Sequence, residues 1–304
     1  MNIFLPVAGV SINLFILIGA GALVGFMSGM FGVGGGFLLT PILMMIGIPP
    51  TVAAASDSCQ IVGASASGAA AHFRLGNVDL KLGSVLLLGG LAGAAVGVQI
   101  IKVLRKLGNA DFVIVVTYIV VLGSIGTFMF VESLQSLRRG SMVGKQRPEG
   151  SKRNILSKLP LHMEFPRSGV QHSILVPFTL CALVGILAAI MGVGGGFIMV
   201  PMMVYLLRMP MHVAVGTDLY QILFTCAGVT FMQAMSNHTV DIVLAVVLMV
   251  GSTIGAQIGV RVGKRLRGDQ LKILLAAIVL LVMVKMAIGL VITPSSLLSF
   301  AKGH

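Results

Sequence analysis

Apolar segments of roughly membrane-spanning length account for most of this 304-residue chain. An α-helix needs about 20 apolar residues to cross a hydrocarbon core of about 30 Å, and eight segments reach this length. Only 10% of the residues are charged, whereas soluble domains carry roughly 25% charged residues. The sequence therefore predicts an all-α polytopic membrane protein and excludes a soluble domain.

The helical segments fall into two sets of five. They are predicted at residues 11–31, 37–47, 51–73, 80–104 and 110–131, and again at residues 172–191, 197–208, 211–236, 240–263 and 269–292. Segments 37–47 and 197–208 are too short to cross, because about twelve residues at 1.5 Å each reach little more than half of the bilayer. We expect half-helices or strongly tilted short helices there.

The hexapeptide GVGGGF occurs twice, at residues 32–37 and 192–197, and a proline follows each copy four residues later. The match extends along the chain, since Val78-Asp79 corresponds to Val240-Asp241. Two homologous transmembrane repeats are therefore predicted, with the helices broken at the glycine-rich motifs. The predicted boundaries are 1–131 for the first repeat, 132–171 for a linker and 172–304 for the second repeat.

The linker carries eight basic residues between Arg138 and Arg167. Lysine and arginine favour the cytoplasmic side, so the linker is predicted to be cytoplasmic. It contributes much of the net charge of +12, which reflects topology and anionic lipids rather than nucleic acid. An odd number of crossings per repeat would make the repeats inverted, a common transporter plan. We favour this plan over an even number, although it places Lys102, Arg105 and Lys106 outside.

Each run of three glycines is predicted to break a helix, since glycine costs about 1 kcal/mol relative to alanine in a helix interior. The exposed N–H groups at the start of the next short helix favour an anion. We expect the two breaks to meet near the midplane and to bind one anion through Gly34, Gly35, Gly36, Gly194, Gly195 and Gly196.

The spaced glycines have a different interpretation, because small-xxx-small spacing is typical of closely packed helices in membranes. This spacing occurs at Gly21, Gly25 and Gly29, at Gly89, Gly93 and Gly97, and at Gly251, Gly255, Gly259 and Gly263. For these residues packing is the favoured role.

Asp57 and Asp218 occupy the same position in the two repeats, each several residues into a hydrophobic segment. A carboxylate at the bilayer centre costs about 2.5–3.5 kcal/mol on insertion scales, and such residues usually serve a function. We predict that they carry protons or sodium, although capping a helix or pairing with a base would also explain them. Neighbouring polar residues predicted to line the same site are Ser56, Gln60, Thr217 and Gln221.

Lys285 lies inside the apolar segment 269–292 and has no charged counterpart in the first repeat. A cation beside an anion path and a salt bridge to Asp57 or Asp218 are both open interpretations. The three cysteines, Cys59, Cys181 and Cys226, have no metal-ligand spacing and are predicted to be structural thiols.

The duplicated GVGGGF followed by proline, and the A-x-G-T element ending at Thr217, resemble the TauE/SafE sulfite exporter family. The resemblance covers nearly the whole chain. It implies a secondary transporter in the bacterial inner membrane for sulfite, sulfonates or related small sulfur-containing anions. Serine often follows G-T in the family, whereas Asp218 stands here, and an acid at this position favours proton coupling.

Other functional classes have less support. No Ser-His-Asp arrangement with suitable spacing, H-E-x-x-H motif or G-x-x-x-x-G-K motif occurs, so neither an enzyme nor an ATPase is predicted. A non-transporting assembly or sensor protein and a passive anion channel remain alternatives. No cofactor or metal is predicted. The predicted partners are a small anion and the lipid bilayer, and a homo-oligomer is left open.

Overall fold

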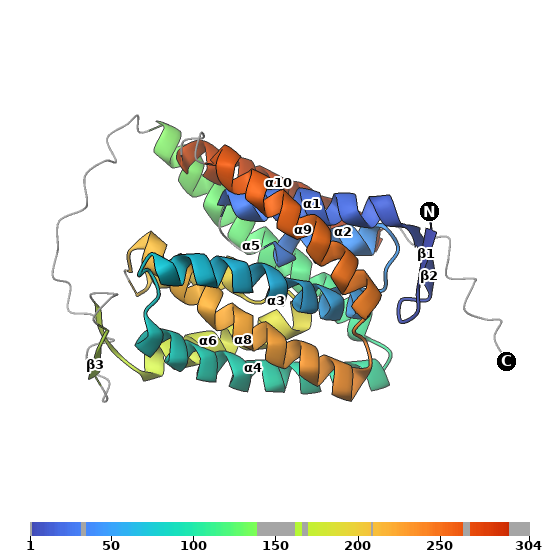
Figure 1. The fold of residues 1–304 in the computed structure, drawn as a ribbon, viewed down its shortest axis with the longest axis horizontal. Helices are drawn as coiled ribbons and strands as arrows, with labels where there is room; N and C mark the ends of the chain where they lie inside the picture. Colours follow the sequence, from blue (N-terminus) through green and yellow to red (C-terminus); the bar gives the residue numbers. More distant parts are fainter. Residues whose placement is uncertain are drawn as a thin grey trace.

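The computed structural model describes residues 2–31, 35–138, 162–165, 170–207, 209–263 and 268–291. This part of the chain contains ten α-helices, most of them aligned with the long dimension of the molecule (Figure 1). In the first half they are α1 (Leu14–Phe31), α2 (Gly36–Met45), α3 (Pro50–Arg74), α4 (Leu80–Lys106) and α5 (Ala110–Arg138). In the second half they are α6 (Leu175–Met191), α7 (Gly196–Tyr205), α8 (Met211–Asn237), α9 (Ile242–Gly263) and α10 (Gly268–Val291).

These helices confirm the predicted all-α architecture and all ten predicted segments. Helices α2 and α7 have 10 residues each and are too short to cross a bilayer, as expected. By length and hydropathy, four described helical stretches can cross a membrane: Leu80–Lys106, Ala110–Phe128, Met211–Asn237 and Ile242–Gly259. This is fewer than the eight expected. Helix α3 has 25 residues but a lower hydropathy, because its polar side chains face the protein interior rather than lipid.

Two β-hairpins precede α1 and α6 and were not predicted. Strand β1 (Asn2–Leu5) pairs with β2 (Val10–Asn13), and β3 (His162–Phe165) pairs with β4 (Val170–Ser173), both antiparallel. The expected helix start at residue 11 is therefore wrong, as is the one at residue 172. In the first hairpin the Asn13 side chain accepts a hydrogen bond of 3.0 Å from the Phe15 amide, so α1 begins at Leu14.

The two hairpins are also 160 residues apart, which is the offset of the two glycine motifs. They lie at opposite ends of the molecule, with β1 and β2 at one end and β3 at the other (Figure 1). An inverted repeat requires this placement. The inverted orientation remains a prediction that the placement supports.

The spaced glycines bring helix backbones into direct contact, as predicted for them. Helix α1 packs against α9, and α4 packs against α6. A Cβ atom on Gly93 of α4 would lie 1.9 Å from the carbonyl oxygen of Ala182 on α6. A Cβ on Gly255 of α9 would lie 2.0 Å from the carbonyl oxygen of Ala22 on α1. No larger residue fits at these positions without moving a helix.

Arg105 has a structural role. It is one of the basic residues that the inverted plan places outside the cell, where basic residues are not expected. Its guanidinium donates a hydrogen bond to the backbone carbonyl of Asn237, the last residue of α8. A cation at a helix C-terminus is favourable, because the helix dipole is negative there. Arg105 therefore stabilises the end of α8 whatever the topology of the loop.

Candidate functional site

The second glycine break is a sharp turn between α6 and α7. Gly192, Gly194 and Gly195 have φ angles of 75°, 74° and 87°, in the left-handed region that favours glycine. The turn is also tightly packed, because a Cβ on Gly192 would lie 2.0 Å from the carbonyl oxygen of Ala54 on α3. The glycines therefore satisfy both a backbone requirement and a packing requirement.

The two breaks lie against each other in the interior. A Cβ on Gly36, at the start of α2, would lie 3.1 Å from the Cα atom of Val193 in the second break. The next residue in each copy continues this contact, since the rings of Phe37 and Phe197 stack with centroids 4.5 Å apart and an angle of 11°. The structure thus brings together the described parts of the two motifs. Gly34 lies outside the described residues.

Helix α7 begins with buried N–H groups. Its N-terminal cap, Gly195, accepts hydrogen bonds from the amides of Ile198 and Met199. Within the described part of the chain, the amides of Gly196 and Phe197 have no hydrogen-bond acceptor, and both residues are buried. A buried helix start with unused donors is well suited to an anion, which the helix dipole also favours.

Asp57 lies directly beside the first break. Its Oδ2 atom accepts a hydrogen bond of 2.7 Å from the Thr40 hydroxyl of α2. The same oxygen would be 3.2 Å from a Cβ on Gly36. Asp57 is fully buried, and its Oδ1 atom has no hydrogen-bond partner. The Tyr118 hydroxyl of α5 lies within electrostatic range of this carboxyl and donates to the Met191 carbonyl.

Asp218 is the corresponding carboxyl on α8. It is 2% exposed, and its Oδ1 atom also lacks a hydrogen-bond partner. Two thiols, those of Cys181 and Cys226, lie within electrostatic range. The position equivalent to Thr40 is Val200, so the second carboxyl has no matching hydroxyl donor.

Neither carboxyl fits the two alternative explanations. Each lies seven residues after the start of its helix, Pro50 or Met211, and so lies beyond the first turn where a capping residue would be. In the described part of the chain, no lysine, arginine or histidine pairs with either of them.

Ser56 and Thr217 contact the opposite half of the chain. The Ser56 hydroxyl accepts a hydrogen bond of 2.9 Å from the amide of Asp241, which caps α9. The Thr217 hydroxyl accepts one of 3.0 Å from the amide of Asp79, which caps α4. These hydroxyls therefore hold helix starts in place beside the carboxyls.

Gln60 and Gln221 lie one turn beyond the carboxyls. The Gln60 amide donates to the Ser252 hydroxyl of α9, and its Oε1 atom is buried without a partner. The Gln221 amide donates to the Thr225 hydroxyl at 2.8 Å and lies against Gly90 of α4. The structure thus places both glutamines in the interior between the two halves.

The other predicted site residues lie elsewhere. Lys285 is exposed on α10, and no described contact joins it to either aspartate. Gly35 packs against Val24 of α1, and Gly195 packs against Val184 of α6. Sequence reasoning missed Thr40, because nothing in the chain marks a hydroxyl 17 residues before Asp57 as its partner.

Comparison with known proteins decides the family. The profile of the family described as "Sulfite exporter TauE/SafE" matches residues 17–286 of this chain. The chain belongs to the TauE/SafE family. This confirms the resemblance inferred from the glycine motifs. A TauE/SafE protein is a multi-pass membrane transporter, and this supports the expectation that the chain is not an enzyme.

Several curated relatives are similar to this TauE/SafE protein. "Probable membrane transporter protein YunE" of Bacillus subtilis is 24% identical over 73% of the chain and 79% of that protein. A "Probable membrane transporter protein" of Xylella fastidiosa is 28% identical over 68% of the chain and 69% of that protein. "Sulfite exporter TauE/SafE family protein 1" of Arabidopsis thaliana is 33% identical, but only over 30% of the chain and 21% of that protein.

No solved structure matches this chain significantly. The bacterial relatives fit the predicted location in a bacterial inner membrane. The names of these relatives support transport but do not define what this TauE/SafE protein carries.

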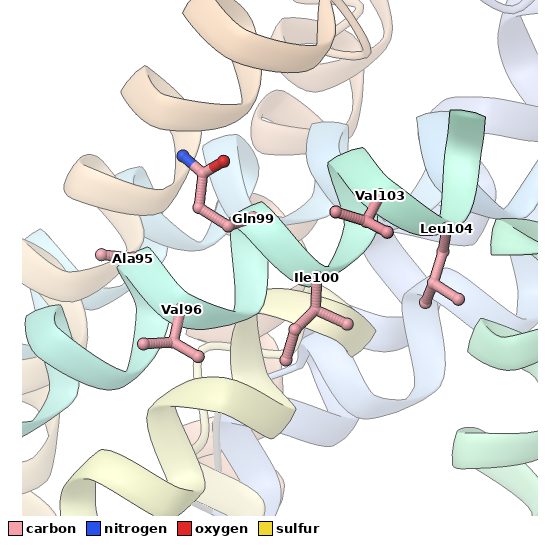
Figure 2. A pocket seen from close by; sticks show the side chains of 6 residues that line it. All are labelled: Ala95, Val96, Gln99, Ile100, Val103 and Leu104. Atoms are coloured by element: carbon pink, nitrogen blue, oxygen red, sulfur yellow. The ribbon is translucent and has the colours of Figure 1, made fainter. Parts of the chain in front are cut away.

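A surface hollow on α4 lies apart from the buried carboxyls. Figure 2 shows its lining, in which the side chains are apolar except for one glutamine and all come from the same helix. The lining residues are Ala95, Val96, Gln99, Ile100, Val103 and Leu104. Exposed apolar side chains of this kind are expected where a membrane helix faces lipid, so the hollow is not the candidate site.

Proposed function

We propose that this TauE/SafE protein is a secondary transporter for a small anion, namely sulfite, a sulfonate or a related sulfur-containing organic anion, and that transport is coupled to protons at Asp57 and Asp218. The observation that carries the proposal is the pair of buried carboxyls. Each has an unpartnered oxygen, and Asp57 contacts the backbone of a broken helix.

The glycine breaks would supply the anion half of the site. The amides of Gly196 and Phe197 are buried donors without acceptors in the described structure. Discontinuous helices that aim their N-termini at an anionic group are a recurring arrangement in transporters with repeats. A small oxyanion could accept these hydrogen bonds. Because glycine has no side chain, the oxyanion could approach the backbone amides closely.

The two carboxyls would bind the protons that are coupled to transport. A charged carboxylate that is buried without a cation is destabilised by several kcal/mol, because the interior replaces its hydration poorly. An anion that enters the same region adds a second unfavourable negative charge. Proton uptake by a nearby carboxyl removes one of the two charges, so binding of the anion and the proton would favour each other.

Both carboxyls are closed off from water in this structure, because Asp57 is 0% exposed and Asp218 is 2% exposed. Transport would therefore require the two halves to move relative to each other. The contact between the breaks, with the stacked rings of Phe37 and Phe197 at its centre, is the place where such movement would open the site. Movement of one repeat against the other is a common form of alternating access.

The test is flux in reconstituted liposomes. Labelled sulfite, sulfoacetate, taurine and sulfate are presented with and without an imposed pH gradient. We expect uphill accumulation of at least one sulfur-containing anion, driven by the gradient. Accumulation that never exceeds equilibrium would indicate a passive channel, and the lack of any gradient-dependent flux would refute the coupled transporter.

Variants separate coupling from folding. We expect Asp218→Asn and Asp57→Asn to reduce gradient-driven flux and to alter its pH dependence. The matched control is Asp111→Asn, because Asp111 is an exposed acid that accepts a hydrogen bond from the Thr51 amide outside the site. Unchanged pH dependence in both site variants would remove the two carboxyls from the coupling mechanism.

A further inference from the structure

We propose that Asp57 and Asp218 exchange protons with opposite sides of the membrane, Asp57 with the side of the β1–β2 hairpin and Asp218 with the side of the β3–β4 hairpin. This inference rests on the proposed proton coupling and assigns a separate role to each carboxyl. It follows from where the two residues lie along their helices. Ser56, next to Asp57, is bonded to Asp241, whose carboxylate accepts a hydrogen bond of 3.0 Å from the Val7 amide in the turn between β1 and β2. Strand β3 lies at the opposite end of the molecule (Figure 1).

Helices α3 and α8 pack antiparallel. Ser56, near the start of α3, is bonded to Asp241, which lies just beyond the end of α8. Thr217, near the start of α8, is bonded to Asp79, which lies just beyond the end of α3. Figure 1 shows the two helices side by side in the middle of the molecule. The residues that follow Ser56 and Thr217 therefore lie near opposite ends.

The depth of each carboxyl follows from the helical rise. Asp57 is seven residues after Pro50, and Asp218 is seven residues after Met211. At 1.5 Å per residue, each carboxyl is about 10 Å from its own end of the helix pair. Gly68, which packs against Leu219, is eleven residues beyond Asp57. The two carboxyls are thus separated by about 17 Å along the helix axes.

Between the carboxyls, the buried glutamines Gln60 and Gln221 lie one turn beyond each aspartate, and apolar groups fill the middle of the region. Gly194, in the second break, is surrounded by Cys226, Ile222 and Ile61. These side chains are at most 3% exposed. The glutamine amides bond elsewhere, Gln60 to Ser252 and Gln221 to Thr225, so among the described residues no continuous chain of hydrogen bonds joins the two carboxyls. A proton cannot move directly across such a gap, because it needs hydrogen-bonded groups or water. Each carboxyl is therefore expected to exchange protons through the nearer end of the molecule.

The groups that face the two carboxyls also differ. Thr40 of α2, Tyr118 of α5 and Cys226 of α8 lie around Asp57. Around Asp218 the corresponding groups are Cys181 of α6 and Cys226 of its own helix. Within the described residues, none of these neighbours is a lysine, arginine or histidine.

The unpartnered oxygens indicate that both carboxyls are available to a proton. The Oδ1 atoms of Asp57 and Asp218 are buried and accept no hydrogen bond. A buried polar atom without a partner is rare in folded proteins and is often connected with function. Two of them at equivalent positions of the two repeats indicate that each carboxyl takes part in proton exchange.

The first experiment uses the unaltered protein in membrane vesicles of known orientation. A hydrophobic carbodiimide modifies protonated buried carboxyls, and mass spectrometry measures the modified fraction at each residue. The pH is changed on one side while a concentrated impermeant buffer holds the other side constant. We expect the modified fraction of Asp57 to follow the pH on the β1–β2 side, and that of Asp218 to follow the pH on the β3–β4 side. Fractions that both follow the same side would overturn the proposal.

The second experiment uses flux in the same vesicles. For one titrating group, a change of one pH unit alters the protonated population up to about tenfold. We expect Asp57→Asn to abolish the response of flux to pH on the β1–β2 side only, and Asp218→Asn to abolish the response on the other side only. Asp111→Asn should keep both responses. Loss of both responses in each single variant would contradict separate roles.

The two experiments also separate this inference from the proposed function. If the unaltered protein shows no flux that depends on a pH gradient, the proposed function fails. Carbodiimide modification still reports which side each carboxyl senses, because it does not require transport. If flux is coupled to the pH gradient but the modification of both carboxyls follows the pH of the same side, the proposed function stands and the inference is refuted.

Discussion

The close contact between α1 and α9 leads to a quantitative prediction for two glycines on the same helix. A Cβ on Gly25 would lie 2.2 Å from the carbonyl oxygen and 2.5 Å from the Cα atom of Ser252 on α9. An ordinary contact between carbon and oxygen is about 3.3 Å, so Gly25→Ala must push the helices apart by about 1 Å. Gly19, also on α1, is exposed and has no atom within 4 Å of its Cβ position.

The expected free-energy changes have opposite signs. A gap of 0.5–1 Å loses a quarter to a half of each contact of about 0.1–0.2 kcal/mol, so about 40 contacting atom pairs would lose about 1–4 kcal/mol. Alanine regains up to about 1 kcal/mol through helix propensity. The difference spans about 0–4 kcal/mol, and overpacking usually costs about 1–3 kcal/mol, so Gly25→Ala should destabilise the protein by about 1–3 kcal/mol. Gly19→Ala should stabilise it by up to about 1 kcal/mol.

The assay is thermal unfolding in detergent, followed with a thiol-reactive fluorophore. Cys181 and Cys226 are free and buried, so they react when the packing is lost. The midpoint should fall by about 2–4 °C per kcal/mol in Gly25→Ala, as for other large domains. In Gly19→Ala it should stay at or above the unaltered value. If both variants have the same midpoint, the close approach of α1 and α9 is refuted.

Three further changes test the structure with the same assay. Ser56→Ala should cost about 1–3 kcal/mol, because the buried amide of Asp241 loses its acceptor, while the anion concentration for half-maximal flux should not change. Arg105→Gln should cost about 1.5–3 kcal/mol by removing a charged donor from the end of α8, and Arg105→Lys should restore part of it. Phe37→Ala should cost about 3–5 kcal/mol, because it removes a buried ring stacked on Phe197.

The Ser56 and Phe37 changes each have a matched control. Ser124→Ala removes an exposed hydroxyl of α5 and should leave the midpoint unchanged. Phe112→Ala removes a ring that is 59% exposed and should have a much smaller effect than Phe37→Ala. An altered anion affinity in Ser56→Ala would instead favour direct contact between the Ser56 hydroxyl and the substrate. An unaffected unfolding midpoint in Phe37→Ala would place the stacked rings outside the folded core.

Much of the fold could be predicted from the sequence, because the bilayer restricts the choice to helices of limited length. The lengths of the apolar segments predicted all ten helices. The spaced glycines predicted close packing, because a glycine has no side chain to keep a neighbouring helix away. The two hairpins were not predicted, because a four-residue strand beside an apolar helix is too short to show a recognisable alternation of apolar and polar residues.

The site was predicted less completely. The repeated positions of Asp57 and Asp218 marked them as unusual, but repetition alone does not show which partners a residue meets. Ser56 and Thr217 were expected to face the substrate, whereas the structure bonds them to helix starts of the opposite half. Lys285 was expected inside, but it is exposed on α10.

The sequence by itself determined the membrane class, the short helices after the two GVGGGF motifs and the family, because each depends on residue types and their spacing along the chain. Only the tertiary structure decided that the breaks touch, that Thr40 bonds to Asp57 and that the two carboxyls lie near opposite ends of an antiparallel helix pair. The physical reason is that these contacts join residues from different helices. Their positions depend on how the helices pack, and no local pattern in the chain records that packing.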